Sequence, residues 1–270
     1  MLAVIVAAGM GTRLGKYTKN LPKGMLPFNG KSLIQWQVDT LRAAGIDDII
    51  IVRGYNPEKI DIKGVEYRIN KAYADTNMVA TLMEAKEDML AADGVLVCYS
   101  DVLYEKRLIT ELLEFSGAVG VLVDDDWQTY WQARMDDWKS DVESLQFDAE
   151  NNITDLGNTA CSLAEAQARY VGLIRFSVDG VKKLVQSYEE NEKKFWDSDA
   201  AWKRSKSFKK AYMTCMLQEL VDTGVPVKAV HTEHGWMEFD TVDDYELAVA
   251  WQKEGNIGRF IDLAGVGSKQ

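Results

Sequence analysis

The sequence predicts a doubly wound α/β fold, in which helices cover both faces of a mostly parallel sheet. The main observation is an alternation along the chain between short β-branched runs and segments with the apolar spacing of helices. The runs are apolar on both faces, which is typical of central strands in a parallel sheet. A length of 270 residues suffices for a substantial core, and no Pro-rich or Ser/Gly-rich linker divides it. We therefore expect a single domain over residues 1–270.

Apolar runs mark the expected strands, and they lie at residues 2–8, 48–54, 94–101, 118–124 and 170–177. A first helix is expected after the N-cap Ser32, and Gly45 is expected to end it. A second helix is expected over residues 77–90, with Asp75 or Thr76 as its N-cap.

The second half of the chain is less regular. Residues 125–165 are acidic and rich in tryptophan, and we expect them to form an insertion on the sheet. Residues 197–225 are expected to be helical, and residues 226–240 to form a pair of strands. The last helix is expected to begin at Thr241, because T-V-D-D fits a capping box with Asp244 at its third position.

The composition excludes several classes of partner. The chain has 31 Lys and Arg against 42 Asp and Glu, a net charge of −11, whereas nucleic acids and anionic membranes both require basic surfaces. No apolar run approaches the roughly 20 residues of a membrane helix, and the N-terminus lacks the basic region of a signal peptide. Three widely spaced cysteines are expected to be reduced, so we expect a cytoplasmic protein without nucleic-acid or membrane partners.

The segment after the first run has the features of a phosphate-binding loop. Gly9 and Gly11 let the backbone approach a ligand and direct N–H groups at an oxyanion. Arg13 offers a bidentate donor for phosphate, and Lys23 offers a mobile charge. A dinucleotide-binding loop would need a third glycine where Leu14 stands, and the P-loop pattern is absent. A Gly-rich turn with two solvated basic residues remains an alternative at this point.

Two carboxylates fall where a ligand crevice is expected. Asp101 ends an apolar run, and the carboxyl ends of strands form the crevice of open α/β sheets. The alternative for Asp101 is a helix cap. In the segment 236–240, the period of two places Trp236, Glu238 and Asp240 on one face of a strand, opposite an apolar face. This pattern favours a site at the late strand.

The pattern G-x-G-T-R-L, followed about ten residues later by P-K-x-x-L-P and then G-K-S-L, resembles nucleotidyltransferases that activate sugar phosphates and small alcohol phosphates. The resemblance extends over nearly the whole chain. It implies a Rossmann-like sheet of the nucleotide-diphospho-sugar transferase type, with residues of about 125–165 and 195–235 as acceptor-binding insertions. It also implies that Arg13 and Lys23 are the catalytic residues on the nucleotide phosphates. The remaining nucleotide contacts that it implies are Ala7, Ala8, Gly9, Gly11, Thr12, Asn77 and Ser100.

The same resemblance assigns the carboxylates. Family members hold Mg²⁺ with an Asp after the central strand and an Asp in a late E-x-D-T-x-x-D segment. Asp101 and Asp240 match these positions, and Glu238 is a weaker third candidate. Mg²⁺ accepts few protein oxygens, because water and substrate phosphates complete its coordination.

Several segments narrow the resemblance to bacterial cytidylyltransferases that act on phosphocholine, on phosphonates such as 2-aminoethylphosphonate, and on phosphoglutamine. These segments are D-T-N-M-V-x-T (75–81), YSDVLY (99–104), YVGLIRFS (170–177), AYMTCMLQEL (211–220) and GWMEFDTVDD (235–244). They imply CTP as the nucleotide and a small phosphate or phosphonate as the acceptor, with Tyr212 and Thr214 facing the acceptor. Many sugar enzymes have W-D-D where this chain has Y-M-T at residues 212–214. Two alternatives remain. The enzymatic one is a sugar-1-phosphate nucleotidyltransferase using UTP, GTP or dTTP, and the non-enzymatic one is a catalytically silent nucleotide sensor.

Aromatic residues are dense where the acceptor is expected to bind, so Trp131 and Trp236, together with Glu238, are predicted acceptor contacts. Aromatic rings and nearby acids would favour a cationic head group such as choline, and the acids would suit a primary amine or an amino acid equally well. The helical spacing of the aromatic residues from 127 to 138 also fits a buried stripe. The basic run 203–210 could bind the acceptor phosphate or form a solvated loop, and the solvated loop is the expectation. The sequence does not decide between a monomer and a homodimer.

Overall fold

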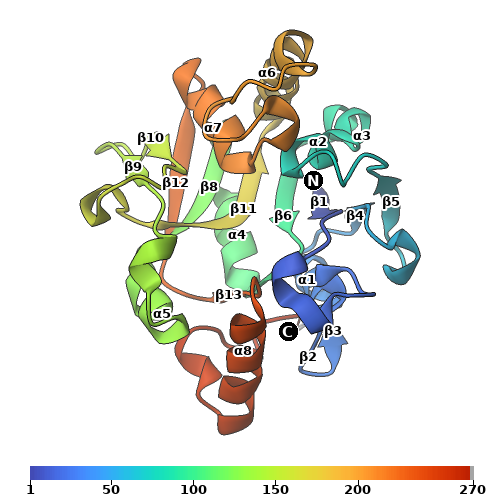
Figure 1. Cartoon of the computed structure of the whole chain (residues 1–270), viewed down its shortest axis with the longest axis vertical. Coiled ribbons are helices and arrows are strands. Elements are labelled where there is room, and N and C mark those ends of the chain that lie inside the picture. Colours follow the sequence, from blue (N-terminus) through green and yellow to red (C-terminus); the bar gives the residue numbers. More distant parts are fainter. Residues whose placement is uncertain (268–270) are drawn as a thin grey trace.

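The computed structural model describes residues 1–267, and a seven-stranded sheet lies at its centre (Figure 1). The strands of this sheet are β1 (Leu2–Ala7), β4 (Asp48–Arg53), β5 (Glu66–Ile69), β6 (Val95–Tyr99), β8 (Val119–Asp124), β11 (Arg169–Phe176) and β12 (Val227–Thr232). Their spatial order is β12-β8-β11-β6-β1-β4-β5. Only β11 runs antiparallel to its neighbours, β6 and β8. The predicted, mostly parallel sheet is therefore confirmed.

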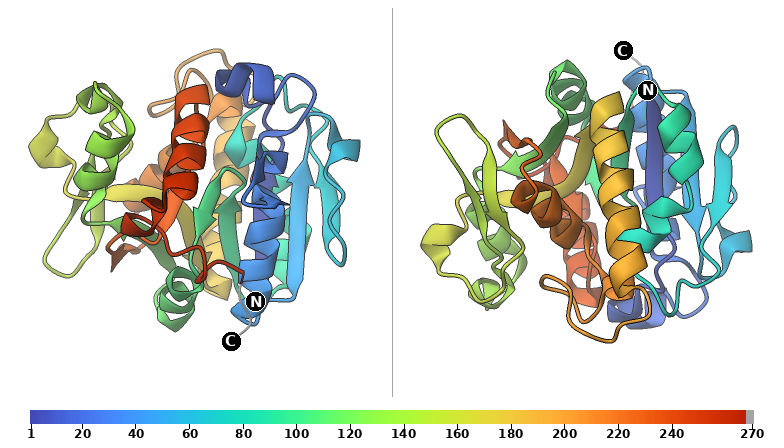
Figure 2. Two further views of the ribbon diagram at one scale, coloured as in Figure 1. Left: turned by 90° about the horizontal axis from the view of Figure 1, so that it is seen from below. Right: turned by 90° about the horizontal axis from the view of Figure 1, so that it is seen from above.

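Helices cover both faces of this sheet, as Figure 2 shows. They are α1 (Leu33–Ala43), α2 (Met78–Met83), α3 (Lys86–Ala91), α4 (Lys106–Glu114), α5 (Trp127–Arg134), α6 (Val178–Phe195), α7 (Met213–Asp222) and α8 (Val242–Glu254). Alternate residues of β1 enter two separate cores, because successive side chains of a strand point to opposite faces. Ala3 and Ile5 pack with α1, α4, α5 and α8, whereas Val4 and Val6 pack with α2, α3, α6 and α7. This two-sided core confirms the doubly wound arrangement.

Short strands outside the central sheet complete the fold. They are β2 (Pro27–Phe28), β3 (Lys31–Ser32), β7 (Val102–Tyr104), β9 (Leu145–Phe147), β10 (Ile153–Leu156) and β13 (Trp236–Glu238). The two strands expected within residues 226–240 form, but they do not pair with each other: β12 joins β8 at the edge of the central sheet, and β13 pairs with β7. None of the described helices is long and apolar enough to cross a membrane.

Three predicted helix ends are confirmed by their caps. The Ser32 hydroxyl accepts a hydrogen bond from the backbone N–H of Gln35 at 3.2 Å, and Gly45 follows α1 with a φ of 85°. Thr241 and Asp244 form the predicted capping box at the start of α8.

Other helix predictions are corrected. The expected helix over 77–90 divides into α2 and α3, and its N-cap is Asn77, whose side chain accepts from the N–H of Met78. In the expected helix over 197–225, only α7 and a 3₁₀ turn at Phe208–Lys210 are helical. Lys203 has a φ of 51°, which a right-handed helix cannot contain.

Residues 125–165 lie beside the sheet as an insertion, formed by α5, a 3₁₀ turn at Trp138–Asp141 and the hairpin β9–β10 (Figure 1). The second expected insertion, residues 195–235, has a different composition. It contains a loop and α7, but its last part is β12, which belongs to the central sheet. The chain is thus one central sheet with one lateral insertion and one loop that packs against α2 and α6.

Candidate active site

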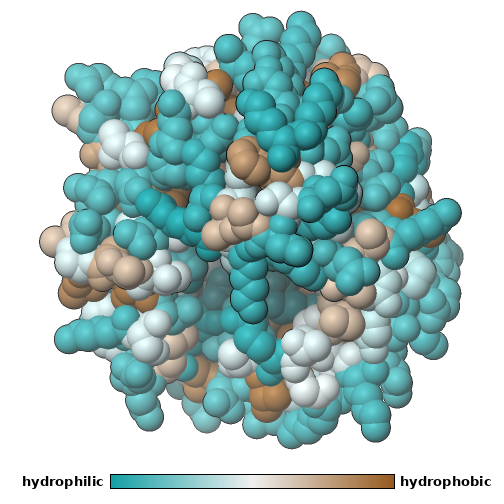
Figure 3. Space-filling view, turned by 45° about the horizontal axis from the view of Figure 1, so that its top comes forward, coloured by the Kyte–Doolittle hydropathy of each residue, from teal (hydrophilic) through white to brown (hydrophobic). Residues whose placement is uncertain are grey.

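A cavity of about 290 Å³ opens at the carboxyl ends of β1 and β6. This is where ligands bind in open α/β sheets. Figure 3 shows a hollow on one face of the molecule, with hydrophilic residues inside it and a rim of mixed hydropathy. Most of the residues that the sequence assigned to nucleotide, phosphates and metal line this cavity: Ala8, Gly9, Gly11, Thr12, Arg13, Lys23, Asn77, Ser100, Asp101 and Asp240.

Ala7 is the exception among the predicted nucleotide contacts. It is the last residue of β1, and its side chain is buried in the core with Ala3 and Ile5. Val6 and Ala8 line the cavity instead. The reason is the alternation of side chains along a strand, which places Ala7 on the opposite face.

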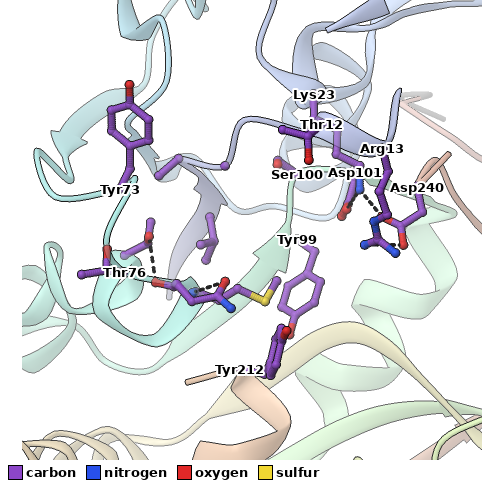
Figure 4. A pocket seen from close by; sticks show the side chains of 17 residues that line it. Thr12, Arg13, Lys23, Tyr73, Thr76, Tyr99, Ser100, Asp101, Tyr212 and Asp240 are labelled. Atoms are coloured by element: carbon purple, nitrogen blue, oxygen red, sulfur yellow. Dashed lines mark hydrogen bonds and ion pairs between the residues drawn. The ribbon is translucent and has the colours of Figure 1, made fainter. Parts of the chain in front are cut away.

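Several cavity residues were missed from the sequence, and Tyr73, Thr76 and Thr81 are the clearest of them. Tyr73 and Thr76 lie on the side of the cavity away from Lys23 (Figure 4). The buried Asn70 donates hydrogen bonds of 2.9 Å to the hydroxyls of Thr76 and Thr81 and so orients both. These residues belong to the loop and helix after β5, and they carry no local motif that could have identified them.

The backbone of the glycine-rich loop lies close to the side chain of Lys23. Gly11 has a φ of 62°, and a Cβ at this position would lie 2.9 Å from Cβ of Lys23. The Thr18 hydroxyl donates to the carbonyl of Gly11 at 2.8 Å and fixes the turn. A glycine is therefore required here both for the backbone conformation and for the space that Lys23 occupies.

Lys23 lies at the centre of the site, between two carboxylates from distant segments. Its Nζ forms ion pairs with Oδ2 of Asp101, which follows β6, and with Oδ1 of Asp240, between β13 and α8. Nη2 of Arg13 contacts Oδ2 of Asp240 at 2.8 Å. The side chain of Lys23 is 13% exposed and that of Arg13 is 67% exposed, so Lys23 is held while Arg13 can reach a ligand. Figure 4 shows the four side chains grouped together.

The charges of this group stabilise one another. Burial alone lowers the pKa of Lys23, but the ion pairs with Asp101 and Asp240 outweigh burial and raise that pKa above its ordinary value. Burial likewise opposes ionisation of Asp240, and Lys23 outweighs it, so the pKa of Asp240 is lowered. Lys23 is thus held as a cation at neutral pH.

The donor set fits Mg²⁺. Carboxylate oxygens of Asp101 and Asp240 converge on one position, and Nζ of Lys23 contacts both of them there. Among residues 1–267, no three His, Cys, Asp or Glu side chains are arranged as a metal site. The protein would therefore supply two ligands, and water with substrate phosphate the others, as Mg²⁺ accepts. Glu238 stays a weaker third candidate, and its carboxylate forms an ion pair with Arg134.

A second cavity of about 510 Å³ shares Arg13, Asp101 and Asp240 with the first and extends towards the insertion. The predicted acceptor contacts Tyr212, Thr214 and Glu238 all line it. Thr214 lies close to Gly157 of the insertion, where a Cβ would come within 2.7 Å of it. The two cavities thus meet at the charged group around Lys23.

Trp131 and Trp236, the other predicted acceptor contacts, lie elsewhere. Their side chains are buried, at 0% and 1% exposure, and they line neither cavity. Trp131 packs edge-on against Trp127 and Tyr130 in the core beneath the insertion. The helical spacing of these aromatic residues therefore reflects a buried stripe. The prediction that Trp131 and Trp236 contact the acceptor is wrong.

The basic run 203–210 is more ordered than the solvated loop that was expected. Lys203 pairs with Glu219 and Asp222 at 2.5 and 2.6 Å. Arg204 forms an ion pair with Asp155 of the insertion, and both Arg204 and Lys206 line the second cavity. The loop therefore closes one wall of that cavity.

Comparisons with known proteins agree with this geometry. Residues 3–145 match the family described as MobA-like NTP transferase domain. The chain is 32% identical over 260 residues to a CTP:phosphoglutamine cytidylyltransferase of Campylobacter jejuni, covering 92% of this chain and 99% of that protein. It is 26% identical over 215 residues to a 2-aminoethylphosphonate cytidylyltransferase of Lancefieldella rimae, covering 72% and 77%.

The fold also resembles that of solved nucleotidyltransferase structures. The structure of the CTP:phosphocholine cytidylyltransferase of Streptococcus pneumoniae superposes with a TM-score of 0.71 at 23% identity, covering 93% of this chain and 98% of that one. Sugar-phosphate nucleotidyltransferases, such as mannose-1-phosphate guanylyltransferases, are more distant relatives that match less than half of the chain. With a Gly-rich loop, a lysine and two carboxylates at the junction of two cavities, the chain belongs to the MobA-like NTP transferase family of nucleotidyltransferases, and CTP-dependent cytidylyltransferases are among its relatives.

Proposed function

We propose that the protein transfers CMP from CTP to a small phosphate or phosphonate acceptor and releases pyrophosphate. The observation that carries the proposal is that Arg13, Asp101 and Asp240 line both cavities, while Lys23, which lines the first, pairs with both carboxylates. A nucleotide in the first cavity and an acceptor in the second would place their phosphates at this group. The names of the cytidylyltransferase relatives support CTP over UTP, GTP or dTTP.

The chemistry needs positioning more than a general base. An oxygen of the acceptor phosphate attacks the α-phosphorus of CTP, and the bond from that phosphorus to the pyrophosphate oxygen breaks. A phosphate monoester has a second pKa of about 6, so its oxygen is already deprotonated at neutral pH. The difficulty is to bring two anions together in line. Lys23, held protonated by its two carboxylates, and the exposed Arg13 supply positive charge at that point.

We further propose that Asp101 and Asp240 hold Mg²⁺ during the reaction. When bound there, the ion would neutralise charge on the nucleotide phosphates. We also propose a cytoplasmic location, supported by the three cysteines, Cys98, Cys161 and Cys215, which are all free in the structure.

The acceptor cavity favours a ligand with a positively charged end. Glu143 of the insertion lines the cavity, and no hydrogen bond or ion pair within residues 1–267 engages its carboxylate. Tyr99 and Tyr170 line the same cavity and pack edge to face, with ring centroids 5.7 Å apart. Burial is the main cause that raises the pKa of Tyr170, and the negative charge of Glu143 adds to it. We propose that Glu143 and these tyrosines receive the cationic group of the acceptor.

A panel of nucleotides and acceptors tests the function. CTP, UTP, GTP and dTTP would each be combined with phosphocholine, 2-aminoethylphosphonate, phosphoglutamine or a sugar 1-phosphate, and pyrophosphate release would be measured with Mg²⁺ and with a chelator. We expect release with CTP and one of the first three acceptors, and loss of release with the chelator. A preference for a sugar phosphate with another nucleotide would contradict the proposal. Binding of CTP without release for any acceptor would favour a nucleotide sensor.

Replacing Glu143 with glutamine tests the acceptor site. We expect KM for a cationic acceptor to rise about tenfold, because one charge-assisted contact is lost, while KM for CTP stays unchanged. Steady-state kinetics with a cationic acceptor and with an uncharged alkyl phosphate would be compared. Glu150→Gln is the matched control, since Glu150 is exposed and lines neither cavity. An equal rise of KM for both acceptors would argue against cation recognition.

A further inference from the structure

A buried arginine of the insertion holds the segment that carries Asp240 from both sides. Arg134, the last residue of α5, has a side chain only 3% exposed. Its Nε and Nη2 donate to Oδ1 and Oδ2 of Asp244 at 2.6 and 2.8 Å, and its Nη1 donates to Glu238. Glu238 ends β13 just before Asp240, and Asp244 lies in the first turn of α8 just after it. One guanidinium therefore ties together the two elements that flank Asp240.

Asp244 transmits this restraint to the backbone of the site. Its Oδ2 accepts the N–H of Asp240 at 3.1 Å and the N–H of Thr241 at 2.7 Å. The turn that presents the Asp240 carboxylate to Lys23 is thus built on a carboxylate that Arg134 grips with two parallel hydrogen bonds. Such a two-pronged pair fixes orientation as well as distance, and a lysine cannot reproduce it.

The same arginine is linked to the wall of the acceptor cavity. Two guanidinium groups contact the ring of Trp131, with Arg134 at 4.9 Å and Arg169 at 4.3 Å from its centroid. Nη1 of Arg169 donates to the carbonyl of Asp141 at 2.8 Å, and Nε1 of Trp131 donates to the Asp141 carboxylate at 3.2 Å. Arg169 and Asp141 both line the acceptor cavity. The insertion thus builds this wall and supports Asp240 with one packed cluster.

We propose that Arg134 is a positioning residue. It holds the Asp240 carboxylate in contact with Lys23 and at the edge of the acceptor cavity. Arg134 lines neither cavity, so it acts through Asp240 and not on a substrate. The proposal explains why a charged residue is buried in an otherwise aromatic core. Its kinetic consequence rests on the proposed cytidylyl transfer, whereas its structural consequence does not.

The test is Arg134→Lys in the full chain, which keeps the buried positive charge and removes the two-pronged grip. The matched control is Arg68→Lys, because Arg68 of β5 makes the same kind of pair with Asp88, Nε at 2.8 Å and Nη2 at 2.5 Å, and lines neither cavity. We expect kcat of Arg134→Lys to fall about 10- to 100-fold with KM for CTP unchanged, as for lost support of a catalytic ligand. Arg68→Lys should keep the wild-type kcat and lose less Tm, because its side chain is 31% exposed. Crystal structures should show the Asp240 carboxylate displaced from Lys23 in Arg134→Lys only.

The outcomes separate positioning from simple destabilisation. The proposal is overturned if Arg134→Lys folds and has the wild-type kcat. It is also overturned if the crystal structure of this variant retains the ion pair between Asp240 and Lys23. A parallel loss of kcat in Arg68→Lys does so as well. If Arg134→Lys does not fold, Asp244→Asn replaces it, since asparagine keeps one oxygen for the backbone N–H groups and loses the ionic grip. If the wild type transfers no CMP, the proposed function fails, and the crystallographic position of Asp240 alone decides on Arg134.

Discussion

Replacing Asp101 with asparagine is expected to lower turnover by about a thousand-fold or more while the fold persists. The amide keeps an oxygen that can accept from Lys23, so the local packing survives, but the negative charge proposed to hold Mg²⁺ is lost. The size of the effect follows from the value of a preorganised charge in a catalytic cleft. Pyrophosphate release at saturating CTP and acceptor measures turnover, and circular dichroism with Tm measures the fold.

A matched control for this change is Asp39→Asn. Asp39 on α1 also pairs with a lysine, Lys31, at 2.6 Å, but it lines neither cavity. We expect this variant to turn over at the wild-type rate. Wild-type turnover in Asp101→Asn itself would remove Asp101 from the metal site and leave it the role of a structural partner of Lys23.

Lys23→Ala is expected to reduce turnover about 10²- to 10³-fold without unfolding the protein, because the central cation of the site is lost. Asp101 and Asp240 would then face each other without an ammonium between them. The pKa of Asp240, which Lys23 now lowers against the effect of burial, is therefore expected to rise. Turnover, Tm and the Tm shift on adding Mg²⁺ would be measured together.

The Mg²⁺ dependence makes this variant informative beyond its rate. Loss of the ammonium removes the cation that pairs with both carboxylates and leaves the exposed Arg13 on Asp240, so added Mg²⁺ should raise Tm more in Lys23→Ala than in the wild type. Lys31→Ala, which removes a paired lysine outside both cavities, should show neither effect. A wild-type rate in Lys23→Ala would refute the phosphate role of Lys23. Absence of any Mg²⁺ effect in Lys23→Ala would count against a metal site at Asp101 and Asp240.

The outcome for the aromatic residues shows a limit of sequence patterns. Trp131 and Trp236 were predicted beside the acceptor because rings and acids are dense in this part of the chain. A ring that could bind a cation and a ring that fills a core have the same spacing on a helix, and only burial distinguishes them. The tyrosines that do line the acceptor cavity, Tyr99 and Tyr170, lie on two neighbouring strands, and no local motif connects them.

The helix caps show the same limit at shorter range. Ser32 and Thr241 were identified correctly, because each directly precedes a clear helical pattern. Around residue 76, three polar residues in a row could each cap a helix, and the structure selects Asn77. Its backbone N–H donates to the carbonyl of Lys209, so a contact with a distant loop holds the residue in place.

The sequence by itself determined the doubly wound sheet and singled out the glycine-rich loop and the carboxylates Asp101 and Asp240, because these depend on periodicity and motifs that lie within short stretches of chain. Only the tertiary structure decided how they act together. Lys23, Asp101 and Asp240 meet at one point although 78 and 217 residues separate the lysine from its partners. Strand order, strand face and burial control such contacts. For this reason Ala7 and Trp131 line neither cavity, whereas Glu143 lines the second cavity and Arg134 holds the segment around Asp240. Side-chain partners across the fold are a property of packing, and no single segment encodes packing.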